Sequence, residues 1–155
     1  MKLQNLKTGE EVEAEIVEVE PNDYKIIKIS KNFSFDWKKE EKLLVYKIRR
    51  KEGNEILGLL SLIDVPQELR IHINLIESSI KHRGKDKELD RIPGCLIAFT
   101  SRESFAKGYG GFISLTPKTK LVDYYVENYG FSQYGRNLAL EGKEAAALIN
   151  KFLES

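Results

Sequence analysis

A basic loop before the start of a predicted helix is the part of this sequence with the clearest chemical use. The loop reads KHRGKDKELDR and spans residues 81 to 91. Its cations are Lys81, Arg83, Lys85, Lys87 and Arg91. A helix that begins near residue 92 adds unpaired backbone N–H groups and a partial positive charge. Together they predict a site for an anion, with Arg91 as its best single residue, and the competing interpretation is a solvated, flexible, charged loop.

Cysteine and histidine chemistry has little support in the sequence. The only cysteine, Cys95, has no intrachain disulfide partner, and the two histidines are too far apart in sequence for metal-ligand spacing. We therefore expect no metal site. Cys95 is most simply a small buried hydrophobic residue on a helix rather than a nucleophile.

The charge of the chain is nearly balanced. Lys and Arg number 25 and Asp and Glu number 24, a formal net charge of +1, which does not point to nucleic acid as a partner. No run approaches the roughly 20 apolar residues that span a membrane, and the N-terminal stretch MKLQNLKTGEEVEAEIVEVE has no apolar signal segment. We expect one soluble domain in a reducing cytoplasm, with neither nucleic acid nor a membrane as a partner.

The elements that precede the basic loop are predicted to be strands. Alternating glutamates predict a half-buried strand over residues 11 to 20, and the run YKIIKIS after Pro21 predicts a second short one. LLVYKIRR and EILGLLSLI predict a hairpin around Gly53 and Asn54. LRIHINLIESSI completes a three-strand meander, and its apolar alternation is lost at Leu75-Ile76.

Helices alternate with strands after the loop. Helical spacing of apolar residues predicts a helix from about residue 92 to the glycines at 108 to 111, and GFISLT predicts a strand after it. LVDYYVENYGF then predicts a helix capped by Gly130, with Phe131 packed over the end. One or two strands and a final helix after Gly142 follow. The fold class is α+β, or mixed α/β, with helices packed on a sheet.

This order of elements, with FISLTPKTKLVDYYVENYGF as its most specific part, resembles the GNAT superfamily of N-acetyltransferases. The resemblance covers roughly residues 43 to 141 of a single domain, leaving a divergent part at 1 to 42 and a C-terminal helix at 142 to 155. It implies a mostly antiparallel central sheet that is splayed in the middle, with helices on both faces. It also implies acetyl-CoA as co-substrate, held in the V between residues 69 to 80 and 111 to 116.

The resemblance further implies which residues hold acetyl-CoA. The phosphate loop of the family matches at Arg91 and Gly94, whereas Leu96 stands where the family has Gly or Ala. Gly94 is either a close-approach glycine or a small residue for helix packing. Backbone donors of residues 76 to 80 would hold the thioester carbonyl and pantetheine. The implied cofactor-binding residues are Ser78, Ser79, Arg91, Ile92, Gly94 and Cys95.

The catalytic residues that the resemblance implies are Glu77 and Tyr125. Glu77, near the expected reaction site, would take a proton from the attacking amine, directly or through water, because only the uncharged amine is a nucleophile. A solvent-facing strand residue is the alternative. The family commonly has a proton-donating tyrosine four residues before the capping glycine, but that position holds Val126 here. Tyr125 and Tyr129 lie near that position, each with a core role as its alternative, and Tyr125 is the candidate proton donor.

Three functions are open at this level. The leading one is an acetyl-CoA-dependent N-acetyltransferase that moves the acetyl group directly to an amine of unknown identity, in a small molecule or a peptide. The second is a catalytically inactive GNAT-like binding or regulatory domain. The third is an interaction module that presents Phe33, Phe35 and Trp37 to a partner. Because residues 1 to 42 look mostly extended, the acceptor side of the cleft either differs from the family or is completed by a second chain in a homodimer.

Overall fold

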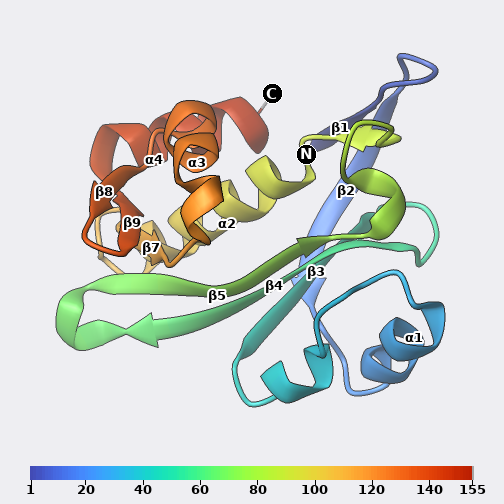
Figure 1. Ribbon diagram of the computed structural model, residues 1–155, viewed down its shortest axis with the longest axis horizontal. Helices are drawn as coiled ribbons and strands as arrows, with labels where there is room; N and C mark the ends of the chain where they lie inside the picture. Colours follow the sequence, from blue (N-terminus) through green and yellow to red (C-terminus); the bar gives the residue numbers. More distant parts are fainter. Residues whose placement is uncertain (155) are drawn as a thin grey trace.

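The structure, a computed structural model, describes residues 1–154 and is built around one nine-stranded sheet (Figure 1). The strand order is β6-β1-β2-β3-β4-β5-β7-β9-β8. The strands are β1 (Lys2–Asn5), β2 (Glu11–Glu18), β3 (Leu44–Arg50), β4 (Ile56–Val65), β5 (Arg70–Ser78), β6 (Leu89–Asp90), β7 (Ile113–Leu115), β8 (Ser132–Tyr134) and β9 (Asn137–Leu140). The helices are α1 (Asp23–Ser30), α2 (Ile92–Ala106), α3 (Val122–Tyr129) and α4 (Gly142–Phe152), and a 3₁₀ turn lies at Trp37–Glu40. Within residues 1–154, no helix is long and apolar enough to cross a membrane.

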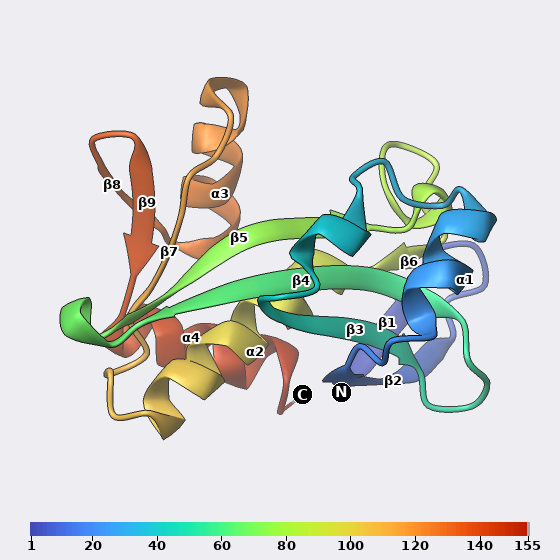
Figure 2. The same cartoon turned by 90° about the horizontal axis from the view of Figure 1, so that it is seen from below.

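Two hydrophobic cores lie on opposite faces of the central strands (Figures 1 and 2). The larger core packs α2 and α4 against the sheet and includes Leu60 of β4. The smaller one joins α1 and the 3₁₀ turn to the other face through Ile27 and Trp37, and it includes Leu59. Since neighbouring residues of a strand point to opposite faces, β4 serves both cores and is apolar almost throughout. The α+β architecture with helices on both faces is confirmed.

Strands β5 and β7 run parallel, whereas the other neighbouring strands described in residues 1–154 are antiparallel. The two strands pair only at Ile71 with Ile113, His72 with Ser114 and Ile73 with Leu115. Beyond that point β5 continues to Ser78, while β7 ends. The sheet therefore opens into a V after Ile73, as the resemblance implied.

A β-bulge in β5 explains the lost alternation at Leu75-Ile76. Leu62 of β4 pairs with Ile73, and the preceding Ser61 pairs with Leu75, so Asn74 is the extra residue. Before the bulge Ile73 faces the larger core, and after it Leu75 packs on the smaller core while Ile76 packs on the larger. The bulge thus fixes which side chains of β5 point to which face.

The prediction of a short strand over YKIIKIS was wrong, because these residues belong to α1. Asp23 and Ile27, one helical turn apart, are the buried side chains of this helix. Asp23 accepts a hydrogen bond at 2.7 Å from the buried Nζ of Lys47 in β3. Ile29 is 79% exposed, so the alternating isoleucines do not mark a half-buried strand. The tertiary contacts of one helical face outweigh the local β propensity.

The predicted end of the helix at LVDYYVENYGF is confirmed. Gly130 caps α3 at φ +80°, in the left-handed region, and its N–H donates to the Val126 carbonyl at 3.1 Å. Phe131 is buried and meets the Tyr125 ring edge-on at 5.9 Å between centroids. A local signal in the sequence was sufficient for this helix because its cap is made by its own neighbours.

Close packing of α2 on α4 depends on Gly94. A Cβ atom added there would lie 2.2 Å from Cε1 and 2.4 Å from Cζ of Phe152. Phe152 is itself buried, so the ring has little room to retreat. Of the two interpretations of Gly94, the structure supports helix packing.

We predict that Gly94→Ala lowers the free energy of unfolding by about 1–3 kcal/mol, measured by urea denaturation. The sign is informative, since Gly→Ala in an unobstructed helix interior raises stability by about 0.5–1 kcal/mol. The substitution should have the opposite sign in a Phe152→Ala background, which lacks the whole ring, including the Cδ1 atom that would lie 2.7 Å from the added Cβ. Equal destabilisation in both backgrounds would show that the ring is not the cause.

Candidate functional site

The candidate site begins at the edge of β5 beyond Ile73, where β7 no longer pairs with this strand. The N–H of Ser79 donates to the Leu57 carbonyl of β4 at 2.9 Å. Because successive N–H groups along a strand point to alternate sides, those of Ile76 and Ser78 face the open side of the V. An open strand edge of this kind can hydrogen-bond an extended ligand along its backbone.

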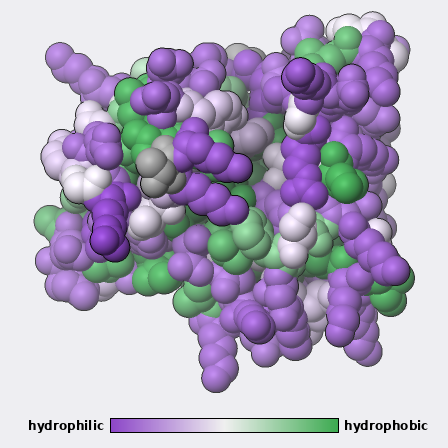
Figure 3. All heavy atoms as spheres, viewed as in Figure 1, coloured by the Kyte–Doolittle hydropathy of each residue, from purple (hydrophilic) through white to green (hydrophobic). Residues whose placement is uncertain are grey.

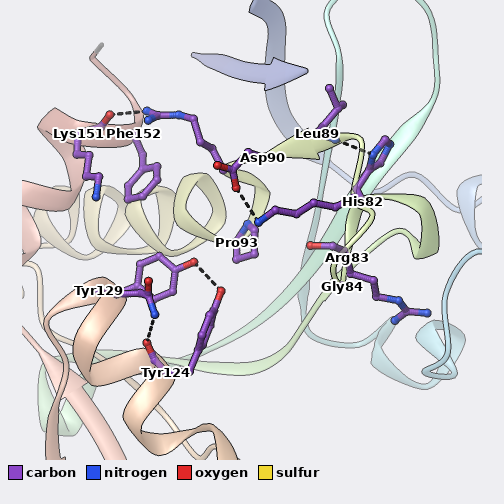
Figure 4. A pocket seen from close by; sticks show the side chains of 14 residues that line it. His82, Arg83, Gly84, Leu89, Asp90, Pro93, Tyr124, Tyr129, Lys151 and Phe152 are labelled. Carbon is purple, nitrogen blue, oxygen red and sulfur yellow. Dashed lines mark hydrogen bonds and ion pairs between the residues drawn. The ribbon is translucent and has the colours of Figure 1, made fainter. Parts of the chain in front are cut away.

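A cavity of about 360 Å³ lies beside the end of this edge (Figure 4). Its walls come from the loop after β5, the start of α2, helix α3 and the end of α4. The lining residues include Ser78, His82, Arg83, Lys87, Asp90, Arg91, Pro93, Tyr124, Asn128, Tyr129, Lys151 and Phe152. The basic loop that the sequence singled out is therefore one wall of the cavity.

Three cations of this loop line the cavity, and each also has a structural contact. Lys87 forms an ion pair with Asp90 at 2.8 Å. Arg83 donates to the Glu77 carboxylate at 2.8 Å. Arg91 donates to the Lys151 carbonyl at 2.5 Å, and its guanidinium lies 4.8 Å from the centroid of the Phe152 ring. The cavity is thus basic, and Arg91 additionally ties the start of α2 to the end of α4.

The start of α2 offers backbone donors at the cavity. Arg91 precedes the helix at φ +83°, and no side chain caps this end. The first helical bond is donated by the N–H of Cys95 to the Arg91 carbonyl at 3.0 Å. Pro93 has no N–H, so Ile92 and Gly94 carry the donors that lack a partner within the helix. This helix end suits an anion.

His82 places a buried donor in the same wall. It is 2% exposed, and its Nδ1 accepts a hydrogen bond from the Leu89 N–H at 3.3 Å. Burial is the main cause that lowers the pKa of His82, so the ring is neutral at pH 7 and carries its proton on Nε2. Within residues 1–154, Nε2 has no hydrogen-bond partner. The Nε2 atom has almost no accessible surface, so it is enclosed by the protein although His82 as a residue lines the cavity.

Glu77 is buried and fully occupied by donors of its own chain. Its carboxylate accepts hydrogen bonds from the backbone N–H groups of Ser34 and Phe35 at 2.6 and 3.2 Å. The indole Nε1 of Trp37 and the guanidinium of Arg83 add bonds at 2.9 and 2.8 Å. Desolvation by burial raises the pKa of Glu77, but these four bonds outweigh it and hold the pKa below the usual glutamate range.

These contacts argue against the predicted base role of Glu77. A carboxylate whose lone pairs are occupied and whose pKa is lowered is a poor proton acceptor. The alternative of a solvent-facing strand residue is wrong, since Glu77 is 5% exposed, while the base role stays a prediction. The structure instead makes Glu77 the anchor of the segment from Ser34 to Trp37 on β5.

The tyrosines of α3 form a cluster at the other wall. Tyr124 lines the cavity, and its hydroxyl lies 3.2 Å from that of Tyr129. Tyr125 does not line the cavity but packs between Tyr124, Tyr129 and Phe131. Burial raises the pKa of Tyr125 and, more strongly, that of Tyr129, so both hydroxyls keep their protons at neutral pH. The proton-donor role of Tyr125 stays a prediction.

The six predicted cofactor-binding residues divide into two groups. Ser78 and Arg91 line the cavity. Ser79, Ile92 and Cys95 are at most 1% exposed, and Gly94 serves the packing of α4. Burial raises the pKa of the Cys95 thiol to about 11, which makes it unreactive at neutral pH. For Ile92 and Gly94, only the backbone N–H groups are suited to a ligand.

Sequence reasoning missed the contribution of the two C-terminal helices to this cavity. Asn128 of α3 lines it, and Figure 4 shows Lys151 and Phe152 at the end of α4 on the same cavity. Their spacing in the sequence carries no phosphate-binding pattern. The missing signal was the packing of α4 on α2, which Gly94 makes possible.

No protein-family model matches the sequence, and no curated protein matches it. Solved structures are similar in fold. Mutant forms of the spermidine/spermine N-acetyltransferase SpeG from Vibrio cholerae are 14% identical with a TM-score of 0.62, over 90% of this chain and 98% of that chain. A GNAT family acetyltransferase from Brucella melitensis in complex with acetyl-CoA is 14% identical with a TM-score of 0.55, over 83% of this chain and 87% of that chain.

Diaminobutyrate acetyltransferase EctA from Paenibacillus lautus, in complex with L-2,4-diaminobutyric acid and coenzyme A, is 13% identical to this chain with a TM-score of 0.52. The similarity covers 86% of this chain and 96% of EctA. At these identities the similarity establishes the fold and leaves the chemistry to the residues of the site. The order of the strands, the parallel pair that parts after Ile73 and these structural relatives together show that the chain has the fold of the GNAT N-acetyltransferases.

Proposed function

We propose that this protein is an acetyl-CoA-dependent N-acetyltransferase that acts on a small-molecule amine. The observation that carries the proposal is the open edge of β5 beside a basic cavity at the start of α2. An extended ligand with an anionic group at one end fits this pair of features. Structural relatives in complex with acetyl-CoA or coenzyme A support the choice of ligand.

In this proposal the chain binds acetyl-CoA in two ways. The N–H groups of Ile76 and Ser78 bond the pantetheine and thioester carbonyls along the edge of β5. The start of α2, Arg83 and Lys87 attract the phosphate groups in the cavity. Arg91 adds charge while it holds α4.

Transfer is direct within the proposed ternary complex. The uncharged amine nitrogen attacks the thioester carbonyl carbon, and the carbon–sulfur bond breaks as the amide forms. The thiolate can leave before it is protonated, because a thiol with a pKa of about 8.5 gives a weakly basic anion. Departure therefore does not require an acid at the position of Val126, and solvent or Tyr125 can supply the proton. Val126 does not by itself exclude the reaction.

A GNAT-like binding domain without transfer activity is the second candidate. It is favoured by the contacts of Arg91, whose guanidinium donates to Lys2 and Lys151 carbonyls and so serves the structure. It is also favoured by Leu96, which is fully buried where the family has a small residue. Such a domain would bind coenzyme A without turning over acetyl-CoA.

We predict that acetyl-CoA binds with a micromolar dissociation constant in a calorimetric titration and that a panel of primary amines releases coenzyme A thiol. Lys87→Gln should weaken binding about two- to fivefold, because it removes a partly exposed cation from the cavity wall. The loss should shrink as the salt concentration rises.

Lys85→Gln is the matched control, since Lys85 is exposed in the same loop and does not line the cavity. The affinity of Lys85→Gln for acetyl-CoA should equal that of the unmodified protein. Absence of heat at millimolar acetyl-CoA would overturn both candidate functions. Binding without thiol release with any amine would favour the inactive domain.

We predict that Glu77→Gln lowers the free energy of unfolding by about 3–5 kcal/mol, because it breaks a buried ion pair and turns an amide N–H₂ toward donors. Amide hydrogen exchange should also rise in residues 33 to 41. Glu55→Gln is the control, since its partners Arg50 and Lys81 lie at the surface, and it should cost under about 1 kcal/mol. Full stability with a changed pH–rate profile would restore Glu77 as the base.

A further inference from the structure

In the proposed function the edge of β5 and the cavity hold acetyl-CoA, so the acceptor amine needs a site of its own. It must approach the thioester from the face of the sheet opposite α2, because α2 and α4 cover the other face (Figure 2). On the face opposite α2, α1 and the 3₁₀ turn at Trp37–Glu40 pack against β4 and β5. The side chains at the bulge of β5 meet this turn.

A hydrogen-bond network fixes one carboxylate at the bulge. The bulge leaves the N–H of Leu75 to donate to Ser61 Oγ at 3.1 Å. Ser61 in turn donates to Glu40 Oε1 at 2.7 Å, and Asn74 Nδ2 donates to the same oxygen at 2.5 Å. Both partners of Oε1 are neutral. Within residues 1–154, Oε2 accepts no hydrogen bond, and no Lys or Arg pairs with Glu40.

The position of this carboxylate relative to the V follows from the register. The last paired position of β5 and β7 is Ile73 with Leu115, and Asn74 is the next residue. Glu40 is therefore bonded to the first side chain beyond the point where the strands part. The N–H groups of Ile76 and Ser78 lie two and four residues beyond Asn74 along the same edge of β5. A carboxylate at the mouth of the V lies where an amine must arrive.

The Glu77 anchor holds the turn that carries Glu40. Trp37, the first residue of that turn, is 2% exposed and donates its indole N–H to Glu77. Glu40 completes the turn three residues later. Glu77 is thus a positioning residue, which acts through Trp37 and the backbone of Ser34.

We infer that Glu40, supported by Ser61 and Asn74, is the acceptor site and binds the ammonium of a primary amine. This inference rests on the proposed function. Oε2 accepts a hydrogen bond from the ammonium and then takes one proton, which leaves an uncharged nitrogen. After that nitrogen attacks the thioester carbon, its second proton passes to the departing thiolate, and Glu40 returns its proton to solvent. The products are the amide, coenzyme A thiol and one released proton.

The charges around Glu40 also limit the class of amine. A groove of about 820 Å³ lies on the same side of the molecule, between α1 and residues 33 to 41, and Lys39 and Glu41 next to Glu40 line it. Its lysines without an ion pair in residues 1–154 are Lys25, Lys28, Lys31 and Lys39. These cations repel a second ammonium group. The site accordingly takes a monoamine in preference to a polyamine.

The test compares Glu40→Gln with Glu20→Gln, since Glu20 is exposed before α1 and lines neither the cavity nor the groove. The amide introduced by Glu40→Gln keeps an acceptor oxygen for Ser61 and Asn74, so the network at the bulge is retained while the charge is lost. With n-butylamine, Glu40→Gln should lower kcat/KM about 100-fold or more, and Glu20→Gln should leave it unchanged. The affinity for acetyl-CoA and the turnover of hydroxylamine, which is uncharged at neutral pH, should stay within about twofold. The n-butylamine deficit should narrow as the pH approaches the pKa of the free amine.

Each outcome separates the acceptor site from the proposed function. Acetyl-CoA binding with equal n-butylamine rates in Glu40→Gln and the unmodified protein would overturn the site and leave the transferase intact. An equal loss with hydroxylamine would assign Glu40 a structural role and also overturn it. Faster turnover of spermidine than of n-butylamine would overturn the monoamine preference. Failure of acetyl-CoA to bind the unmodified protein would overturn the function itself.

Discussion

The parting of β5 from β7 after Ile73 is the constraint on which the rest of the site depends. Parallel strands need a crossover connection, and here that crossover is the basic loop and α2. The loop returns the chain from the far end of β5, so the start of α2 lies near the open part of that strand. The same topology therefore creates both the unpaired strand edge and the helix terminus beside it. Ligands of open α/β sheets bind at such switch points for this reason.

A buried carboxylate connects the two faces of the sheet at this edge. Glu77 belongs to β5 beside the cavity, but its side chain points to the smaller core and meets donors from residues 34 to 37. A buried charge is tolerated only when hydrogen bonds satisfy it, which is why the loop around Phe35 is ordered by the carboxylate. Arg83 shares that carboxylate and also lines the cavity (Figure 4). Arg83 thus links the Glu77 carboxylate on one face of β5 to the wall of the cavity.

Local patterns predicted much of the fold and little of the site. The β3 to β5 meander and the Gly130 cap depend on residues close in sequence, and both were predicted correctly. The partner of Gly94 is the ring of Phe152, and the backbone and indole donors to Glu77 lie 40 to 43 residues away in the sequence, so neither could be predicted from spacing. The lost alternation at Leu75-Ile76 was a real signal, but only pairing with β4 shows that it is a bulge.

The nearly neutral composition conceals local clusters of charge on both sides of the open strand edge. Most of the face in Figure 3 is hydrophilic, with apolar side chains gathered near its middle. Cations such as Lys87 gather at the cavity beside α2, whereas Glu40 stands at the bulge without a cationic partner in residues 1–154. Cations therefore lie on both sides, and the Glu40 carboxylate is a local exception that suits one ammonium group. In the proposed reaction the two reactants would meet beyond Ile73, where the pairing of β5 with β7 ends.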